Sequence, residues 1–303
     1  MNKLPSVVII IINYNRPIDT LECIESIQKI NYSPFHIILV DNCSTDNSLK
    51  LLKEKLSDVN IYSTQVNLGY TGGVNCGFKI AENFNSDYIL LLNNDTIAEK
   101  NFLTNLVKAM EHFKNAAAAC GTILCEHNRN EIWYAGGELI KWRGLAIHKW
   151  KGNNFSKLKL SAPIYTSFIT GCMMILRSEL LKKIGYEDER FYMYLDDIEF
   201  SARIAGLGYK LLYVPDSIIY HKVLYESESS FKLYYSVRNR LLLISLISSG
   251  LLNKISTTYF LIIISLKLIY WRFFKSKFFK AAKNGLQDFF RKDFYKGRGF
   301  DHF

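Results

Sequence analysis

The chain has 303 residues, of which 49% are hydrophobic and 22% are charged. This composition excludes an intrinsically disordered chain and predicts a globular protein with a full core, as one large domain or as one domain with an appendage. The formal net charge is +10, and its distribution is uneven. Residues 271–303 contain nine Lys or Arg and three Asp, a net charge of +6, so the rest of the chain carries +4.

The basic tail is also rich in aromatic residues: Trp271, Phe273, Phe274, Phe278, Phe279, Phe289 and Phe290. Basic tails bind nucleic acid or anionic membranes. Aromatic residues interleaved with the charges favour a membrane surface. We therefore expect an anionic membrane as a partner, and no nucleic acid.

The six cysteines are scattered along the chain: Cys23, Cys43, Cys76, Cys120, Cys125 and Cys172. They form no C-x-x-C pair, so zinc spacing is absent and no disulfide framework is indicated. Reduced thiols in a cytoplasmic compartment are the simplest interpretation. The apolar run 7–12 is too short for a signal peptide and lacks a small-residue cleavage site, so we predict a buried strand there.

Four strand–helix units are predicted within the first hundred residues. The strands cover residues 7–12, 35–40, 59–63 and 88–92. Apolar residues at helical spacing follow the first two strands, and a third helix runs to about Phe84 after a glycine-rich segment. Crossovers of this length produce a mostly parallel sheet with helices on its faces, so the predicted fold class is α/β.

Polar residues stand at the carboxyl ends of three of these strands: Asn13 and Asn15, then Asp41, and then Asn93, Asn94 and Asp95. Parallel strands place these ends on one edge of the sheet, where ligands collect in open α/β folds. Magnesium is usually held by one or two carboxylates together with substrate phosphates, and Asp95 offers such a ligand. A simple turn is the alternative, because Asn and Asp also favour turns.

The second half of the chain has further predicted elements: helices at 100–113, 178–181 and 196–205, and strands at 116–124, 164–176 and 209–214, the last ending before Pro215. Residues 131–163 show no clear pattern. The segment 67–75 contains glycines but neither G-x-G-x-x-G after a strand nor G-K-[ST], so it indicates neither a nicotinamide site nor a P-loop. Its glycines allow close approach to a phosphate or sugar, or form a tight turn.

Asp196, Asp197 and Glu199 form a second acidic centre at the start of a predicted helix. Carboxylates there complement the helix dipole, which is the structural explanation. A carboxylate that reaches an acceptor hydroxyl acts instead as a general base. His221 follows the last strand, and a single histidine is usually structural, although neutral imidazole also binds divalent metals.

Two uncharged runs, 241–253 and 255–266, are divided by Lys254. Each is shorter than the roughly 20 residues that a spanning helix needs. We expect helices that lie in the membrane interface. A transmembrane hairpin or single span over 241–271 and an ordinary buried helical pair are the alternatives.

Several segments occur in an order that resembles a known family. They are Val-Val-Ile-Ile-Ile-Ile-Asn-Tyr-Asn (7–15), Leu-Val-Asp-Asn-Cys-Ser-Thr-Asp (39–46), Asn-Leu-Gly-Tyr-Thr-Gly-Gly-Val-Asn (67–75), Leu-Leu-Asn-Asn-Asp (91–95), Tyr-Leu-Asp-Asp-Ile-Glu-Phe (194–200) and Tyr-Tyr-Ser-Val-Arg-Asn (234–239). This order is similar to that of the family-2 inverting glycosyltransferases, particularly the rhamnosyltransferase-like branch. The resemblance covers about residues 5–240.

The resemblance implies a GT-A fold at residues 1–224. The uncharged runs and the basic, aromatic tail predict a helical, membrane-associating extension at 225–303. The resemblance also implies inverting transfer of a sugar from a nucleotide-diphosphate donor, with thymidine-diphosphate rhamnose as the first candidate. The acceptor would be a hydroxyl of a lipid-linked saccharide or polysaccharide in cell-surface glycan synthesis. The enzyme would then be cytoplasmic and peripheral on the inner face of the cell membrane.

The resemblance further implies roles for single residues: donor nucleotide binding by Asn13, Asn15, Asp41, Asn67, Gly72, Gly73 and Asn94, binding of Mg²⁺ or Mn²⁺ by Asp95 and His221, an acceptor side at Gly171, Cys172 and Asp196, and the catalytic base at Asp197. Asn93 replaces the first Asp of the family's D-x-D motif, so only one anionic metal ligand remains there. Two other functions are weighed against this one: a non-catalytic, membrane-bound scaffold derived from such enzymes, and a dinucleotide-dependent oxidoreductase.

Overall fold

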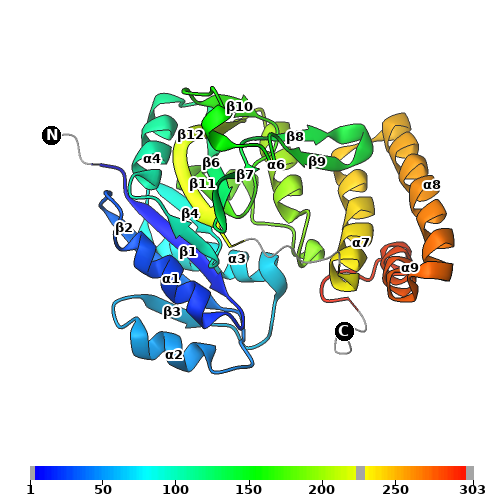
Figure 1. The fold of residues 1–303 in the computed structure, drawn as a ribbon, viewed down its shortest axis with the longest axis horizontal. Coiled ribbons are helices and arrows are strands. Elements are labelled where there is room, and N and C mark those ends of the chain that lie inside the picture. The colour runs from blue at the N-terminus through cyan, green and yellow to red at the C-terminus, as the bar shows by residue number, and fades with distance from the viewer. Residues whose placement is uncertain (1–3, 223–228, 298–303) are drawn as a thin grey trace.

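The structure is a computed structural model that describes residues 4–222 and 229–297. One ten-stranded sheet forms its centre, and helices cover both faces of that sheet (Figure 1). Three C-terminal helices lie side by side at one end of the molecule. The expected α/β class is confirmed.

The first half of the chain alternates strands and helices as predicted. The elements are β1 (Val7–Asn13), α1 (Pro17–Ile27), β2 (Phe35–Asp41), α2 (Ser48–Lys55), β3 (Asn60–Ser63), α3 (Gly69–Ala81), η1 (Glu82–Phe84) and β4 (Tyr88–Leu92). The strands run parallel in the order β3-β2-β1-β4. All five residues of β4 are buried, because helices cover both of its faces.

The second half extends the same sheet with a mixture of directions. Its elements are β5 (Thr96–Ala98), α4 (Phe102–His112), β6 (Ala116–Cys125), β7 (Asn128–Tyr134), β8 (Gly137–Ile140), η2 (Lys141–Arg143), β9 (Leu145–His148), η3 (Phe155–Lys157), β10 (Ile164–Thr166), β11 (Met173–Arg177), α5 (Ser178–Ile184), η4 (Glu189–Phe191), α6 (Asp196–Gly206) and β12 (Lys210–His221). β11 is antiparallel to both β4 and β6, and β12 is parallel to β6.

Two strand predictions are wrong. The pattern at 164–176 is two separate strands, β10 and β11, with residues 167–172 between them. The last strand does not end before Pro215 but continues to His221, with a register shift between Val214 and Ile218. A bulge at that point accommodates Pro215, which has no N–H group for the ladder. The continuation of β12 carries His221 to the edge of the sheet at which β1, β2 and β4 end.

The C-terminal helices are α7 (Ser230–Ile247), α8 (Gly250–Phe274) and α9 (Ser276–Arg291). The predicted division at Lys254 is wrong, because Lys254 lies inside α8 and the break falls at residues 248–249. Leu242 and Leu243 of α7 belong to the main hydrophobic core. The expected domain boundary at 224/225 lies within 223–228, outside the described residues.

Candidate active site

Asn13 and Asp41 meet where the parallel strands β1 and β2 end. The Asn13 side chain donates a hydrogen bond to Asp41 Oδ1 at 2.8 Å, and both residues are buried. Ser44 donates to the same carboxylate from its hydroxyl (2.6 Å) and its backbone N–H (3.0 Å). Thr20 donates to Asn13 Oδ1 at 2.8 Å. The two predicted residues therefore form a fixed polar corner, because several hydrogen bonds hold one carboxylate.

Asn15 extends this corner toward the loop that follows β2. Its backbone has a positive φ of 53°, which Asn tolerates better than most residues. Its Oδ1 accepts a hydrogen bond from the backbone N–H of Thr45 at 2.8 Å. The sequence reasoning missed Ser44 and Thr45, although both lie in the segment 39–46 that carried the resemblance.

The glycine-rich segment packs against the protein itself at the two predicted glycines. Both Gly72 and Gly73 lie in α3 and are buried. A Cβ atom at Gly72 would lie 2.5 Å from Leu68 Cβ, and one at Gly73 would lie 3.0 Å from Ile12. Asn67 accepts hydrogen bonds from Gly69 N–H (2.9 Å) and from the Tyr192 hydroxyl (3.2 Å). Donor binding by these residues stays a prediction, since the visible role of the two glycines is close packing.

Asn93, Asn94 and Asp95 form the turn after β4 at the same edge of the sheet. Asn94 donates a hydrogen bond to the Thr20 hydroxyl at 2.9 Å, which connects the turn to the Asn13–Asp41 corner. Asn93 lies with its Oδ1 3.2 Å from the Tyr70 hydroxyl. The segment is thus the turn that was the alternative interpretation, and metal binding by Asp95 in this turn stays a prediction.

Asp95 and His221 are brought together from β4 and β12. Asp95 Oδ1 lies 3.1 Å from His221 Nε2. Oδ1 receives no hydrogen bond of ordinary geometry within residues 4–222 and 229–297. In an octahedral site with bonds of about 2.1 Å, neighbouring ligand atoms lie about 3.0 Å apart. These two atoms therefore fit adjacent positions around a Mg²⁺ or Mn²⁺ ion.

The surroundings of this pair favour an ionised carboxylate. Burial opposes ionisation of Asp95, but His221 and then Arg16 outweigh it and lower the pKa of the carboxyl group. Arg16 Nη1 lies 3.4 Å from Asp95 Oδ2. The Trp133 ring packs edge-on against the His221 ring, with centroids 4.8 Å apart, and so fixes its orientation. Sequence reasoning missed both Arg16 and Trp133.

The carboxyl groups of Asp196, Asp197 and Glu187 lie near one another at the start of α6. Asp196 is buried, whereas Asp197 remains partly exposed. Asp197 Oδ2 accepts a hydrogen bond from the Gly171 backbone N–H at 3.1 Å. Burial raises the pKa of both aspartates, and the charge of Asp197 raises that of Asp196 further. Glu187, which sequence reasoning missed, is also buried, and its pKa is raised by burial and then by Asp196 and Asp197.

Tyr70 connects the Asn93 turn to Asp197. Its hydroxyl lies 3.2 Å from Asn93 Oδ1 and 3.0 Å from the Gly171 carbonyl oxygen. Gly171 in turn donates its N–H to Asp197. Cys172 is buried, and its carbonyl oxygen accepts the N–H of Asn93. The predicted acceptor-side residues Gly171 and Cys172 thus lie between the Asn93–Asp95 turn and the acidic centre.

The turn that precedes α6 has an unusual backbone. Tyr192, Tyr194 and Leu195 have φ values of 63°, 68° and 66°. Left-handed conformations of such bulky residues cost roughly 1–3 kcal/mol each and persist only where the surroundings impose them. This turn sets the direction in which Asp196 and Asp197 enter the site, because they are the first two residues of α6.

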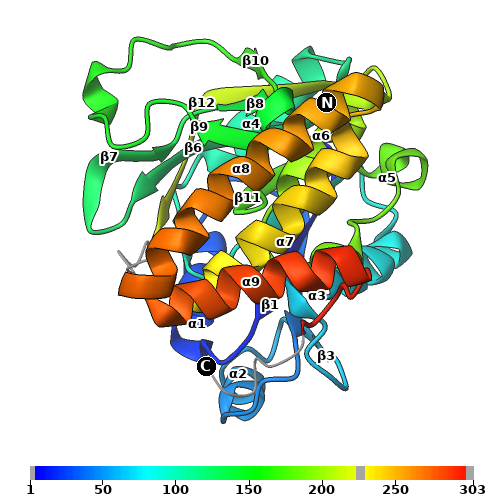
Figure 2. The ribbon, with the colours of Figure 1, turned by 90° about the vertical axis from the view of Figure 1, so that its right-hand side faces the viewer.

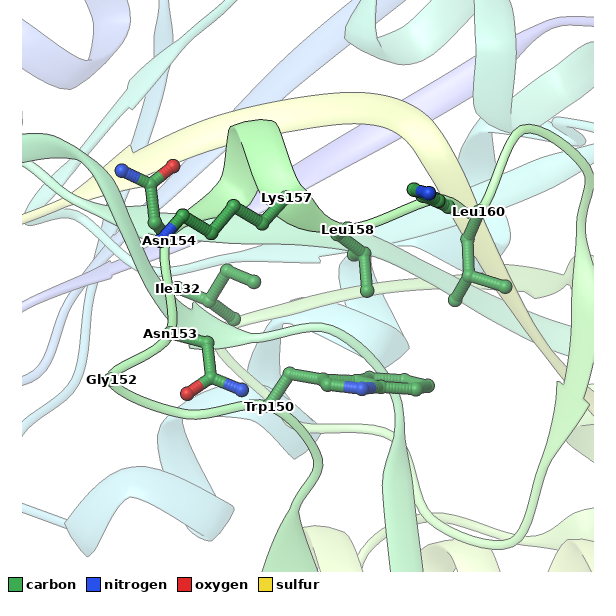
Figure 3. Close-up of a pocket in the computed structure, with 9 residues that line it drawn as sticks. Ile132, Trp150, Gly152, Asn153, Asn154, Lys157, Leu158 and Leu160 are labelled. Carbon is green, nitrogen blue, oxygen red and sulfur yellow. The ribbon is translucent and has the colours of Figure 1, made fainter.

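A separate hollow of about 620 Å³ lies beside β7, under the loop that follows β9 (Figure 3). Its lining includes Ile132, Trp150, Asn153, Lys157 and Leu160. None of the residues predicted from the sequence to bind donor, metal or acceptor lines it. The candidate active site is therefore the polar edge of the sheet and not this hollow.

The comparison with protein families agrees with the geometry of the sheet edge. Residues 8–185, more than half of the 303 residues, match the model of glycosyl transferase family 2. The chain therefore belongs to this family and is a glycosyltransferase. Family membership excludes the dinucleotide-dependent oxidoreductase.

Two rhamnosyltransferases are among the similar curated proteins. The O-antigen chain rhamnosyltransferase WbaN of Salmonella anatum is 23% identical over 240 residues, which are 77% of this chain and 71% of that protein. The N-acetylglucosaminyl-diphospho-decaprenol L-rhamnosyltransferase of Mycobacterium tuberculosis (strain ATCC 25618 / H37Rv) is 21% identical over 208 residues, 62% of this chain and 67% of that protein. The resemblance to the rhamnosyltransferase-like branch is thus confirmed at low identity.

Two solved structures share the fold. The mannosyltransferase PcManGT from Pyrobaculum calidifontis, in complex with GDP-Man and Mn²⁺, has a TM-score of 0.58 at 13% identity, covering 96% of this chain and 88% of that one. GalNAc-T7 with UDP, GalNAc and Mn²⁺ has a TM-score of 0.63 at 20% identity and covers 78% of this chain. The chain spans 48% of the length of GalNAc-T7. The expected GT-A fold is confirmed.

Glu187 makes the stability of the protein depend on pH. Because its pKa is higher in the folded protein than in the unfolded chain, the stabilisation is complete below about pH 4.5 and is lost as the pH rises through the folded value. Glu187→Gln cannot ionise. We expect its melting temperature to match the wild type near pH 4 and to exceed it by several degrees near pH 8.

Thermal melts across this pH range test the prediction. Glu25→Gln is the matched control, because it makes the same chemical change at an exposed position. A melting curve for Glu187→Gln with the same pH dependence as the wild type would contradict the assignment of a raised pKa.

Proposed function

We propose that this glycosyltransferase moves a sugar from a nucleotide-diphosphate donor to a hydroxyl group of a lipid-linked saccharide or polysaccharide, with inversion at the anomeric carbon. The observation that carries the proposal is the Tyr70 connection, which joins a metal-compatible Asp95–His221 pair to a partly exposed carboxylate, Asp197. A non-catalytic scaffold has no need of such a carboxylate beside such a pair.

Asp197 is proposed as the general base. It is the more exposed of the two aspartates at the start of α6, and its raised pKa brings it nearer to neutral pH, where proton transfer from a hydroxyl is more efficient. In the ionised form it accepts the acceptor's proton while that oxygen attacks the anomeric carbon. The bond to the diphosphate breaks on the opposite face, so a single displacement inverts the configuration.

Asp95 and His221 are proposed to hold a Mg²⁺ or Mn²⁺ ion, which stabilises negative charge on a diphosphate leaving group as a Lewis acid. Asp95 would supply a carboxylate oxygen and His221 a ring nitrogen, and the Trp133 ring packs against the His221 ring. The two solved structures described above contain Mn²⁺, which supports this choice. Arg16 adds a positive charge on the same edge of the sheet.

Asn13, Asn15 and Asp41 are proposed to bind the nucleotide, with Asn67 and Asn94 beside them. The polar corner they form is held by internal hydrogen bonds, so it is organised before a donor arrives. Thymidine-diphosphate rhamnose is the proposed donor, supported by the two rhamnosyltransferase relatives. The name of the mycobacterial relative, which contains a decaprenol diphosphate, supports the lipid-linked acceptor.

Asp197→Asn tests the base. We expect transfer to fall by about 10²–10⁴-fold, because the amide accepts no proton. Donor binding, measured as the thermal shift caused by the nucleotide sugar, should survive. Asp216→Asn, at an exposed position on β12, is the control and should keep full activity. Full turnover by the Asp197 variant would refute the assignment.

Asp95→Asn tests the metal pair. Removal of the carboxylate charge should weaken Mn²⁺ binding at least about tenfold, a loss that even outer-shell partners of a metal produce. The readouts are the Mn²⁺-induced thermal shift and the Mn²⁺ concentration that half-saturates transfer. The prediction fails if both quantities equal those of the Asp216→Asn control.

The long helix α8 supports the proposed membrane surface. It has 25 residues and is the one helix within the described residues that is long and apolar enough to cross a membrane by length and composition. It forms the outermost element of the C-terminal end (Figure 2). Its exposed apolar residues recur at helical spacing: Leu251, Ile255, Ile262, Leu266, Ile269 and Phe273.

The other side of α8 faces the protein. Its buried residues Ser256, Phe260, Ile264 and Trp271 lie along one stripe. Trp142 of η2 contacts Tyr259 with ring centroids 5.1 Å apart. Because α8 is fastened along its length to the enzyme, we propose that it lies in the membrane interface and does not cross the bilayer. The neighbouring α9 exposes Lys277, Lys280 and Lys283 for anionic headgroups.

Replacement of Ile262 and Leu266 by Glu tests this surface. Both residues are exposed, at 56% and 60%, so the folded protein should keep its melting temperature. Co-sedimentation with anionic phospholipid vesicles should fall at least about tenfold, because two charges would enter the apolar region. Leu4→Glu, at a 56% exposed position, is the matched control. Equal vesicle binding by the double variant and the control would refute the proposed surface.

A further inference from the structure

Two buried polar residues of α7 bind the turn that leads into α6. The Asn239 side-chain amide donates to the carbonyl oxygens of Phe191 (2.9 Å), Met193 (2.8 Å) and Tyr194 (2.9 Å). Arg238 Nη2 donates to the carbonyl oxygens of Arg190 (3.0 Å) and Phe191 (2.9 Å). We call these two side chains the α7 clamp.

The clamp binds a turn whose backbone is strained. Tyr192, Tyr194 and Leu195 have positive φ values, and a turn of this shape leaves successive carbonyl groups without regular ladder partners. The amide of Asn239 lies within hydrogen-bond distance of three carbonyl oxygens in this segment, those of Phe191, Met193 and Tyr194. The clamp therefore selects this conformation of the turn.

Arg238 is an unusual residue to bury for stability alone. Its side chain is fully buried, and it forms no salt bridge within the part of the chain that the structure describes. Its guanidinium donates to Arg190 and Phe191, to Tyr295 O at 2.7 Å and to Asn239 Oδ1 at 2.9 Å. Burial of a charge without a counter-charge is costly. The Tyr234 and Tyr235 rings, 5.5 and 4.8 Å from the guanidinium, and the carbonyl oxygens offset this cost, and two of those oxygens belong to Arg190 and Phe191 at the start of the turn.

The same turn contacts the glycine-rich segment. Tyr192 donates its hydroxyl hydrogen to Asn67 Oδ1 at 3.2 Å, and its carbonyl oxygen accepts the Thr71 N–H at 3.3 Å. The Tyr192 ring stacks on Tyr235 of α7, with centroids 5.5 Å apart. One turn thus joins α7, the glycine-rich segment and the start of α6. A shift of the turn changes where Asp197 lies relative to the donor side.

We propose that Arg238 and Asn239 are positioning residues for the transfer reaction, which act through the turn 191–195 to hold Asp197 at the acceptor hydroxyl. The proposal rests on the proposed role of Asp197 as the base. It makes α7 part of the catalytic machinery and not a linker to a membrane anchor. The membrane-facing helices α8 and α9 pack on α7, so their removal is expected to disturb the active site as well.

Asn239→Ala in the full chain tests the clamp, with Tyr234→Phe as the matched control. Tyr234 is also buried on α7, and its hydroxyl donates to Asp288 of α9 at 2.6 Å. Phenylalanine keeps the ring, which lies 5.5 Å from the Arg238 guanidinium, and removes only this hydroxyl. Both variants remove one buried polar group from the same helix. Asn239→Ala should lower kcat about 10²-fold, the effect of misplacing a reacting group by about 1 Å. KM for the donor should change much less, because the turn reaches the donor side only through the contacts of Tyr192 with Asn67 and Thr71.

Tyr234→Phe should leave kcat unchanged, although its melting temperature should fall by about as much as that of Asn239→Ala. Hydrogen–deuterium exchange gives the second readout. Amides in residues 191–197 should exchange faster in Asn239→Ala but not in Tyr234→Phe. If Asn239→Ala does not fold, Arg238→Lys takes its place with the same expectations. Lysine keeps the positive charge but lacks the planar guanidinium group that donates several hydrogen bonds at once.

Equal kcat and equal exchange in the clamp variant and the control would overturn the proposal. An equal fall of kcat in both variants would also overturn it, because the loss would then follow stability alone. Failure of the wild-type chain to transfer any nucleotide sugar would instead refute the proposed function. The exchange comparison still reports on the clamp in that case, so the two failures are distinguishable.

Discussion

Parallel pairing of β1 with β2 and with β4 is the constraint on which the rest of the site depends. The pairing requires helical crossovers, and it places the carboxyl ends of the strands on one edge. This placement explains why Asn13, Asp41 and Asp95 lie at the same edge, because each stands at or just beyond the end of one strand. The strands themselves are buried, and Asn13 and Asp41 at their ends are buried and hydrogen-bonded as well, so this edge of the sheet is held rigidly.

The second half of the chain completes the site from the other side. β12 continues through its bulge and brings His221 to Asp95, and β11 leaves Gly171 and Cys172 just before its own start. Tyr70 then connects the Asn93–Asp95 turn to Gly171. Charge is distributed unequally across this site. The neighbours of Asp95 favour its ionised form, whereas burial favours the protonated forms of Asp196 and Asp197. Such separation of carboxyl pKa values is typical of metal-binding and proton-transferring roles in one site.

The C-terminal helices combine two roles in one small unit. α7 contributes Leu242 and Leu243 to the main core and carries the clamp on the turn before α6. α8 exposes apolar residues on one side and packs on η2 and α7 with the other. In the proposed arrangement, α8 attaches the enzyme to a membrane, and α7, on which α8 packs, places the catalytic base. A lipid-linked acceptor would then arrive from the surface on which the enzyme itself lies.

Local patterns in the sequence were sufficient for the strands β1, β2 and β4 and for the start of α6 at Asp196, because apolar runs and polar strand ends depend on neighbours in the chain. The family followed from the resemblance of the ordered motifs to known members. The long strand β12 and the two-strand division at 164–176 were not predictable, since a bulge compensates for Pro215 and pairing partners decide where a strand ends. Tyr70, Glu187, Arg238 and Asn239 acquire their roles only through contacts between distant segments. The sequence alone therefore determined the fold class, the family and the candidate chemistry, whereas the tertiary structure decided which of these groups meet, because hydrogen bonding and burial depend on contacts between residues far apart in the chain.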